Sequence, residues 1–292
     1  MDADALIEWA LEDAVSDSET PPGPPLLAGA IRHAVFPGGA RIRPQLCLAV
    51  AAACQEECGG DLLVSAGVGA SLELLHCASL VHDDLPCFDG ADMRRGKPSV
   101  HRTFGEPIAL LAGDALIVMA FSALAKACGA APAVLARVIP IVATAVGAPG
   151  GIVAGQAWES EAQVDTRAYH RAKTGALFIG AAEAGAASVG AEPAPWRALG
   201  ASLGDAYQVA DDLRDLLMDG AALGKPAGQD ERFDRPSAVR DLGVRGAMAE
   251  LSALIEAAAD SVPDCAGAPA LRALVHDQAA RLMPASLARS VA

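Results

Sequence analysis

The sequence predicts an all-α fold for this chain of 292 residues. Apolar residues recur at helical spacing along most of the chain, for example in Ser71–His82. No segment shows the strict alternation of apolar and polar side chains that is typical of strands. Glycine and proline mostly separate the apolar segments. Hydrophobic residues make up 52% of the chain, which is enough for a large core, and no break in composition marks a second domain. We therefore expect one domain over residues 1–292.

The first part of the chain predicts helices separated by proline-rich breaks. Residues 1–20 form an amphipathic pattern, and the stiff linker Glu19–Pro25 follows, so residues 1–25 read as an N-terminal helix with its linker. The helical pattern resumes over Leu26–Val35 and is broken by Phe36–Gly39. Pro44 suits the first turn of a helix over Gln45–Ala53.

The remaining helices are predicted from apolar periodicity and from the glycine and proline residues that bound them. We expect them at Ala109–Cys128, Pro132–Ala145, Thr166–Val189, Pro195–Asp219, Arg245–Ser261 and Ala268–Leu287, the last with a possible break at Pro284.

An acidic segment follows the apolar run at Ser71–His82. Pro86 disfavours the α conformation at Leu85, so the helix should end there with Asp83 and Asp84 in its last turn. Two carboxylates are unfavourable at a helix C-terminus unless a cation neutralises them. With Asp89 from the following loop they could form an oxygen site of the kind that Mg²⁺ prefers.

Basic residues and a second acidic cluster strengthen this interpretation. Arg94 and Arg95 follow the first cluster, and guanidinium groups bind phosphate oxygens bidentately. Downstream, Asp211, Asp212 and Asp215 form a second cluster. Asp211 and Asp215 are four residues apart and share a helix face, as does Gln208 one turn earlier, so the two like charges repel unless a cation lies between them.

These motifs resemble those of the trans-isoprenyl diphosphate synthases, the polyprenyl synthetase family. The first cluster matches the family's Asp-Asp-x4-Asp motif followed by Arg-Arg-Gly-Lys-Pro, and the second matches Asp-Asp-x2-Asp with Gly224-Lys225-Pro226 after it. The similarity extends from about Phe36 to about Gly246. Phe36–Pro44, Ala154–Glu161 and Lys225–Asp230 look most like geranylgeranyl diphosphate synthases of phototrophic bacteria. The resemblance implies a bundle of about ten or more helices around a central cavity, a homodimer, and Mg²⁺ held by both clusters.

The resemblance also implies two substrate sites. Arg43, His76 and Arg95 would bind isopentenyl diphosphate. This chain has Ala40 where the family has a lysine of that site, so either the site is weaker or Arg41 compensates.

Other residues match positions that handle the allylic diphosphate. Arg94, Lys173, Thr174, Gln208 and Lys225 would bind it, with Lys173, Gln208 and Lys225 acting in catalysis, and Arg235 stands where the family usually has a lysine. Gln156 and Glu159 match a Gly-Gln-x-x-Asp segment and would support the metal.

The predicted function is a prenyl transfer that lengthens an allylic diphosphate by five carbons. The allylic substrates would be dimethylallyl, geranyl and farnesyl diphosphate. Ala78 lies five residues before Asp83, roughly 7 Å below the metal end of the helix. In the family an aromatic residue near this depth often stops the product at C15, whereas Ala78 and Ser79 leave room for C20, with Leu74, Leu75 and Phe121 as candidates for the deeper floor. The resemblance places such a product in carotenoid and bacteriochlorophyll synthesis.

Three alternatives remain: a farnesyl or longer polyprenyl diphosphate synthase, a non-catalytic partner subunit, and a terpene cyclase. Both intact acidic motifs argue against the partner subunit, and the basic segments argue against the cyclase.

The composition bears on three further properties: nucleic-acid binding, membrane spans and the cellular compartment. The net charge of −14 argues against a nucleic-acid partner. Asp114 interrupts the apolar run at Ile108–Ala125, and prolines and glycines interrupt Val138–Ala157, so we expect no membrane span but buried helices. The acidic N-terminal residues and seven scattered cysteines predict a cytoplasmic protein with reduced thiols.

Overall fold

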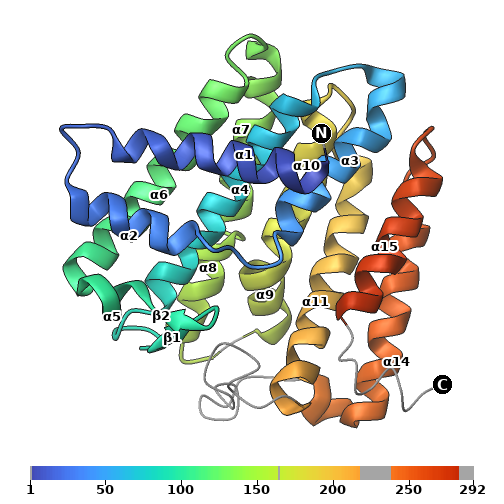
Figure 1. Ribbon diagram of the computed structural model, residues 1–292. Helices are drawn as coiled ribbons and strands as arrows, with labels where there is room; N and C mark the ends of the chain where they lie inside the picture. The colour runs from blue at the N-terminus through green and yellow to red at the C-terminus, as the bar shows by residue number, and fades with distance from the viewer. Residues whose placement is uncertain (1, 164, 218–237, 283–292) are drawn as a thin grey trace.

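The computed structural model describes residues 2–163, 165–217 and 238–282. Its helices surround α4, and the predicted all-α class is confirmed (Figure 1). In the first part of the chain the elements are α1 (Ala3–Ser16), η1 (Asp17–Glu19), α2 (Pro25–Val35), α3 (Ile42–Cys58), α4 (Leu62–Asp83), α5 (Val100–Phe104), α6 (Glu106–Ala127) and α7 (Pro132–Val146). They continue with α8 (Ile152–Ala157), η2 (Trp158–Ser160), α9 (Thr166–His170), η3 (Arg171–Gly175), α10 (Ala176–Ser188), η4 (Ala194–Trp196), α11 (Arg197–Leu217), α14 (Ala238–Asp260) and α15 (Ala268–Leu282).

Helix α4 is the centre of the core. It packs against α6, α3, α10 and α1, and most of its side chains are buried, including Leu72, Leu74 and Leu75. Asp61 caps its start by accepting a hydrogen bond from the Leu63 N–H at 2.9 Å. Because neighbours cover α4 along most of its length, its carboxyl end is held in a fixed position.

Several helix boundaries differ from the sequence prediction. The helix expected from Gln45 begins earlier, at Ile42, after Arg41 in the left-handed region (φ 50°). Within the described residues α14 already includes Ala238, and Gly243 (φ 68°) interrupts its geometry just before the predicted start at Arg245. The predicted end of the last helix, Leu287, lies outside the described residues. Arg94 and Lys97 also pair in a ribbon, β1 (Met93–Arg94) with β2 (Lys97–Pro98), that the sequence did not predict.

Two predicted helical segments are interrupted. The apolar stretch 138–157 is divided by residues 147–151, where a Cβ on Gly151 would lie 2.4 Å from the Val146 carbonyl carbon. Thr166–Val189 is helical nearly throughout, but η3 within it is a π-helical turn that contains Lys173 and Thr174. Such turns are often found at functional sites.

Helices α4 and α6 are long and apolar enough to cross a membrane by length and composition. The most apolar window of α4 is 72% buried inside the fold, as in the core helix of a globular protein, whereas that of α6 is 39% buried. Leu110, Leu111 and Val118 of α6 are at least half exposed. Thus α6 has one face on the core and one apolar face open.

Candidate active site

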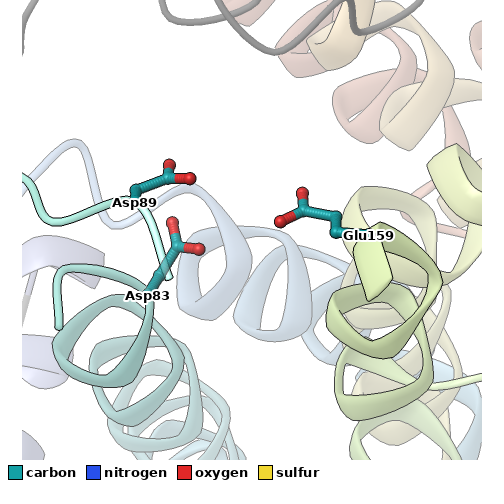
Figure 2. Close-up of side chains that lie close together, drawn as sticks. All are labelled: Asp83, Asp89 and Glu159. Carbon is teal, nitrogen blue, oxygen red and sulfur yellow. The ribbon is translucent and has the colours of Figure 1, made fainter. Parts of the chain in front are cut away.

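The acidic loop after α4 folds back over the end of the helix. Asp83 is the last residue of α4 and Asp84 its C-cap. The Asp89 N–H donates to the Asp83 carbonyl at 3.0 Å, and the Gly90 N–H donates to the Leu85 carbonyl at 3.1 Å. Gly90 has φ 60°, a left-handed conformation that glycine adopts without strain. This turn brings the carboxylate of Asp89 above that of Asp83 (Figure 2).

A third carboxylate faces these two from the opposite side of the cavity. Oxygens of Asp83, Asp89 and Glu159 all lie within 4.8 Å of one another, with Glu159 extending from η2 (Figure 2). Burial raises the pKa of Asp83, and the nearby charges of Asp89 and Glu159 raise it further, against the opposing effect of Lys173 and Arg94. Asp83 Oδ1 is buried and receives no hydrogen bond from the described residues. Three hard oxygen donors converging at this separation fit a divalent cation such as Mg²⁺.

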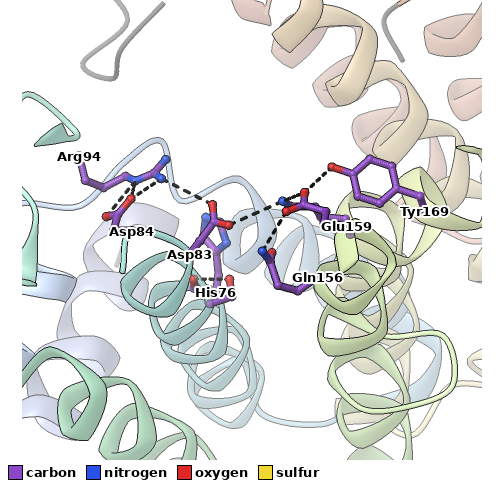
Figure 3. A network of polar contacts seen from close by, with 9 residues as sticks. His76, Asp83, Asp84, Arg94, Gln156, Glu159 and Tyr169 are labelled. Carbon is purple, nitrogen blue, oxygen red and sulfur yellow. Dashed lines mark hydrogen bonds and ion pairs between the residues drawn. The ribbon is translucent and has the colours of Figure 1, made fainter. Parts of the chain in front are cut away.

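Cations and polar groups hold this cluster in place (Figure 3). Lys173 forms an ion pair with Glu159, and its Nζ lies 3.7 Å from Asp83 Oδ1. Gln156 and Tyr169 also donate to Glu159, at 3.1 and 2.7 Å. Sequence reasoning missed Tyr169, whose only signal is its position one helical turn before Lys173. Gln156 and Glu159 both lie at this cluster, and their predicted support of the metal stays a prediction.

The second acidic cluster lies across the cavity on α11. Asp211 and Asp215 line the cavity. The Thr174 hydroxyl donates to Gln208 Oε1 at 2.9 Å, and Gln208 Nε2 donates to Asp212 at 3.0 Å. The π-helical turn and the second acidic motif are therefore joined by one chain of hydrogen bonds.

Asp84 and Asp212 occupy a different position from the other predicted metal ligands. Arg94 holds Asp84, with Nη2 2.5 Å from Oδ1, and the Ala238 N–H donates to Asp212 at 2.7 Å. Both carboxylates are almost fully buried, and neither lines the cavity. In this arrangement they orient neighbouring groups, so direct metal ligation by these two residues stays a prediction.

The predicted binding site for isopentenyl diphosphate lies beside α4. Arg43 is buried, its guanidinium stacks on Phe178 (4.8 Å) and Tyr207 (5.7 Å), and its Nη1 lies 3.4 Å from His76 Nε2. Burial and the nearby cation of Arg43 lower the pKa of His76 well below its usual range. This shift favours the neutral imidazole of His76, which can still donate or accept a hydrogen bond.

Arg41, which follows Ala40, is bound by protein acceptors. Its three guanidinium nitrogens donate to Glu8, Glu73 and the Val35 carbonyl, at 2.8, 2.8 and 2.9 Å. Three of its five N–H groups are thus bound to protein acceptors, which disfavours the compensating role considered from the sequence.

One cavity of about 950 Å³ connects these groups. Its upper part is lined by Asp83, Asp89, Asp211, Asp215, Arg43, His76, Arg94, Arg95, Lys173, Thr174 and Gln208. Its lower part is lined by apolar and small residues, including Leu75, Ala78, Ser79, Ile117, Val146 and Leu177. Leu75 was predicted as a floor residue. Leu74 and Phe121 were also predicted there but do not line the cavity. Leu74 is the neighbour of Leu75, and successive helix positions diverge by about 100°. Lys225 and Arg235 lie outside the described residues.

The fold and this site define the class of protein. A geranyltransferase from Legionella pneumophila has a TM-score of 0.78 at 27% identity, with 95% of this chain and 94% of that chain covered. A geranyltransferase from Helicobacter pylori, complexed with magnesium and isoprenyl diphosphate, also has a TM-score of 0.78, at 26% identity with 94% and 96% covered. The chain has the isoprenoid synthase fold.

Sequence comparisons identify the family. The polyprenyl synthetase model matches residues 24–266, so the chain belongs to the polyprenyl synthetase family. A geranylgeranyl diphosphate synthase from Cereibacter sphaeroides is 50% identical over 285 residues, 98% of each chain. Another from Rhodobacter capsulatus is 49% identical over 291 residues, 99% of this chain and all of the relative. The predicted family and enzyme class, a prenyltransferase, are confirmed.

Proposed function

We propose that this protein is a magnesium-dependent geranylgeranyl diphosphate synthase that condenses isopentenyl diphosphate with allylic diphosphates. One observation carries the proposal: two acidic clusters and two separate groups of cations line the polar mouth of a single deep, largely apolar cavity. This arrangement suits two diphosphates side by side with a hydrocarbon chain below them. The similarity to two geranylgeranyl diphosphate synthases supports the C20 product.

In this proposal Asp83, Asp89, Asp211 and Asp215 hold magnesium, with Glu159 beside the first site. Magnesium bound there would neutralise the departing diphosphate and weaken the carbon–oxygen bond of the allylic substrate. Lys173, Thr174, Gln208 and Arg94 orient that diphosphate from its flanks. Fixed cations around a group that gains negative charge stabilise the transition state, since they need no reorganisation. The roles of Lys225 and Arg235 remain predictions.

Isopentenyl diphosphate is bound by Arg43, His76 and Arg95 on the other side. The double bond of this substrate attacks the allylic carbon, and one proton is then lost. Because the neutral imidazole of His76 is favoured and is held by Arg43, we assign it to binding. The departing diphosphate takes the proton. The preferred starter, and a role in carotenoid and bacteriochlorophyll synthesis, belong to the same proposal.

The first experiment is product analysis. Purified protein with Mg²⁺ and isopentenyl diphosphate is supplied separately with dimethylallyl, geranyl or farnesyl diphosphate. We expect a dominant C20 product with each starter. A C15 product or one longer than C20 would retain the chemistry and favour the alternative synthases. No condensation with any starter would favour the partner-subunit alternative.

We also propose a homodimer through α6. Leu110, Leu111 and Val118 expose an apolar strip on this helix, at 50%, 51% and 66% of their surfaces. Asp114, whose side chain is 61% exposed, lies between them on the same face. Exposed apolar side chains gathered on one helix face can mark a protein interface. A second copy could cover it by packing its own α6 on the same strip.

The dimer predicts a clear effect of one surface substitution. Val118→Glu would place a charge in the interface, and we expect a shift from dimer to monomer in light scattering coupled to size exclusion. Leu26→Glu is the matched control, because Leu26 of α2 is 64% exposed and lies outside this strip. A monomeric unmodified protein, or a dimer that Val118→Glu leaves intact, would contradict this interface.

The predicted cytoplasmic location stays a prediction.

A further inference from the structure

Glu73 is a buried carboxylate outside both acidic clusters. It lies on α4, and its side chain is 2% exposed. It lines the same cavity, one turn before His76 on the helix. A buried carboxylate is unfavourable unless cations and donors compensate it. The groups that compensate the charge of Glu73 therefore indicate its role.

Two arginines from different segments meet at Glu73. Arg41 Nη1 donates to Glu73 Oε1 at 2.8 Å, and Arg95 Nη2 approaches the same oxygen at 3.5 Å. Arg95 Nη1 lies 3.8 Å from Cys77 Sγ, one turn along α4. Glu73 thus connects the segment before α3 with the ribbon after the first acidic motif.

The backbone around these arginines is shaped for this arrangement. Arg41 (φ 50°) and Arg95 (φ 54°) are the described non-glycine residues with positive φ, a strained conformation for such residues. Gly38 and Gly39 make the space. A Cβ on Gly38 would lie 2.1 Å from Arg41 Cζ, and one on Gly39 would lie 3.1 Å from Arg95 Nε. Interactions with the rest of the fold must outweigh this strain, and Glu73 supplies one to each arginine.

Two opposite effects of Glu73 on a diphosphate can be distinguished. Its negative charge would repel the ligand, which predicts tighter binding when the charge is removed. Its ion pairs fix the direction of Arg95 and keep Arg41 out of the ligand's way, which predicts weaker binding when they are lost. Orientation should dominate, because Arg41 compensates the charge directly and because removing one member of a buried ion pair leaves its partners uncompensated.

We propose that Glu73 is a positioning residue for isopentenyl diphosphate: it orients Arg95 toward the diphosphate and holds Arg41 in the wall of the site. This inference rests on the proposed function. Ala40 strengthens the argument, because with no lysine at that position Arg43 and Arg95 are the cations left for this diphosphate, and the orientation of Arg95 matters more.

The test compares the two carboxylates that bind the same guanidinium. Glu73→Gln keeps the shape and removes the buried charge. We expect the KM for isopentenyl diphosphate to rise at least about tenfold, the loss expected when roughly 1.4 kcal/mol of binding free energy disappears. The KM for geranyl diphosphate should change less than about twofold, because its proposed binding groups do not contact Glu73. Glu8→Gln is the control: Glu8 also binds Arg41, at 2.8 Å, but is 47% exposed, and exposed ion pairs contribute little.

Other outcomes would overturn the inference. An unchanged or lower KM for isopentenyl diphosphate in Glu73→Gln would do so, as would a fall in kcat with both KM values unchanged. If Glu73→Gln fails to fold, Glu73→Asp is the second test. Its shorter side chain keeps the charge but cannot reach both arginines, so the KM for isopentenyl diphosphate should rise. A wild-type KM in this variant would reject the inference. No condensation by the unmodified enzyme would reject the proposed function and this inference together, whereas normal condensation with an insensitive Glu73→Gln variant would reject only the inference.

Discussion

Asp83→Asn is expected to lower kcat by at least about 10³-fold while the protein stays folded. Loss of one preorganised electrostatic group alone costs about 10²–10³-fold in kcat, and Asp83 is also a proposed metal ligand shared with Asp89 and Glu159. Stability should not suffer, because Asn has the same shape and removes a buried charge that faces two other carboxylates. Steady-state turnover with geranyl diphosphate and thermal unfolding of the same samples provide the measurements.

Asp92→Asn is the matched control for this substitution. Asp92 follows in the same loop, but its side chain is 70% exposed and pairs with Arg102 at the surface. We expect wild-type turnover for this variant. Magnesium together with inorganic diphosphate should raise the melting temperature of the wild type and of Asp92→Asn, and raise it less for Asp83→Asn. Turnover close to wild type in Asp83→Asn would remove Asp83 from the proposed metal site.

Ala78→Phe is expected to change the main product from C20 to C15. Ala78 is 2% exposed and lines the cavity below Asp83. Its substituent points into the space that the growing chain would occupy, so a phenyl ring would fill part of the cavity rather than overpack the core. The C20 fraction should fall at least about tenfold if the obstruction costs the longer chain about 1.4 kcal/mol or more in the transition state. Chromatography of the dephosphorylated products gives this ratio.

Ala78→Ser distinguishes volume from position. It changes the same residue with little added bulk and should keep the C20 product. Condensation of dimethylallyl diphosphate should continue in Ala78→Phe, since the diphosphate groups lie above the substitution. A C20 product from Ala78→Phe would mean that the chain takes another route, for example along Ile117 and Val146, which also line the cavity.

Much of the fold could be predicted because its signals are local. Helical periodicity, Pro86 after the first acidic pair and the glycines between α7 and α8 act over a few residues, and most helices agree with their expected ranges to within a few positions. Boundaries were predicted less well where distant contacts decide them. Helix α3 begins at Ile42, directly after Arg41, whose side chain is bound by Glu8 and Glu73, and contacts across such sequence separations leave no local pattern.

The motifs also located most of the candidate site, because the residue types themselves carry the chemistry. Carboxylate pairs and an arginine pair could be assigned to metal and diphosphate binding before any geometry was known, whereas Lys173 and Thr174 were assigned through the resemblance to the family. The residue types did not show which carboxylate of each motif faces the cavity and which is held by a neighbouring protein group. Asp83 and Asp84 are adjacent in the chain, yet Asp83 faces the cavity and Asp84 is held by Arg94.

The sequence by itself determined the helical class, the family, and the two acidic motifs with their accompanying cations. Only the tertiary structure decided which carboxylates face one another, that Tyr169 binds Glu159 beside the first cluster, and that Arg41 is bound to Glu73 and Glu8. The physical reason is that burial and electrostatic pairing depend on distances between side chains from separate helices, and those distances are set by the packing around α4 (Figure 1).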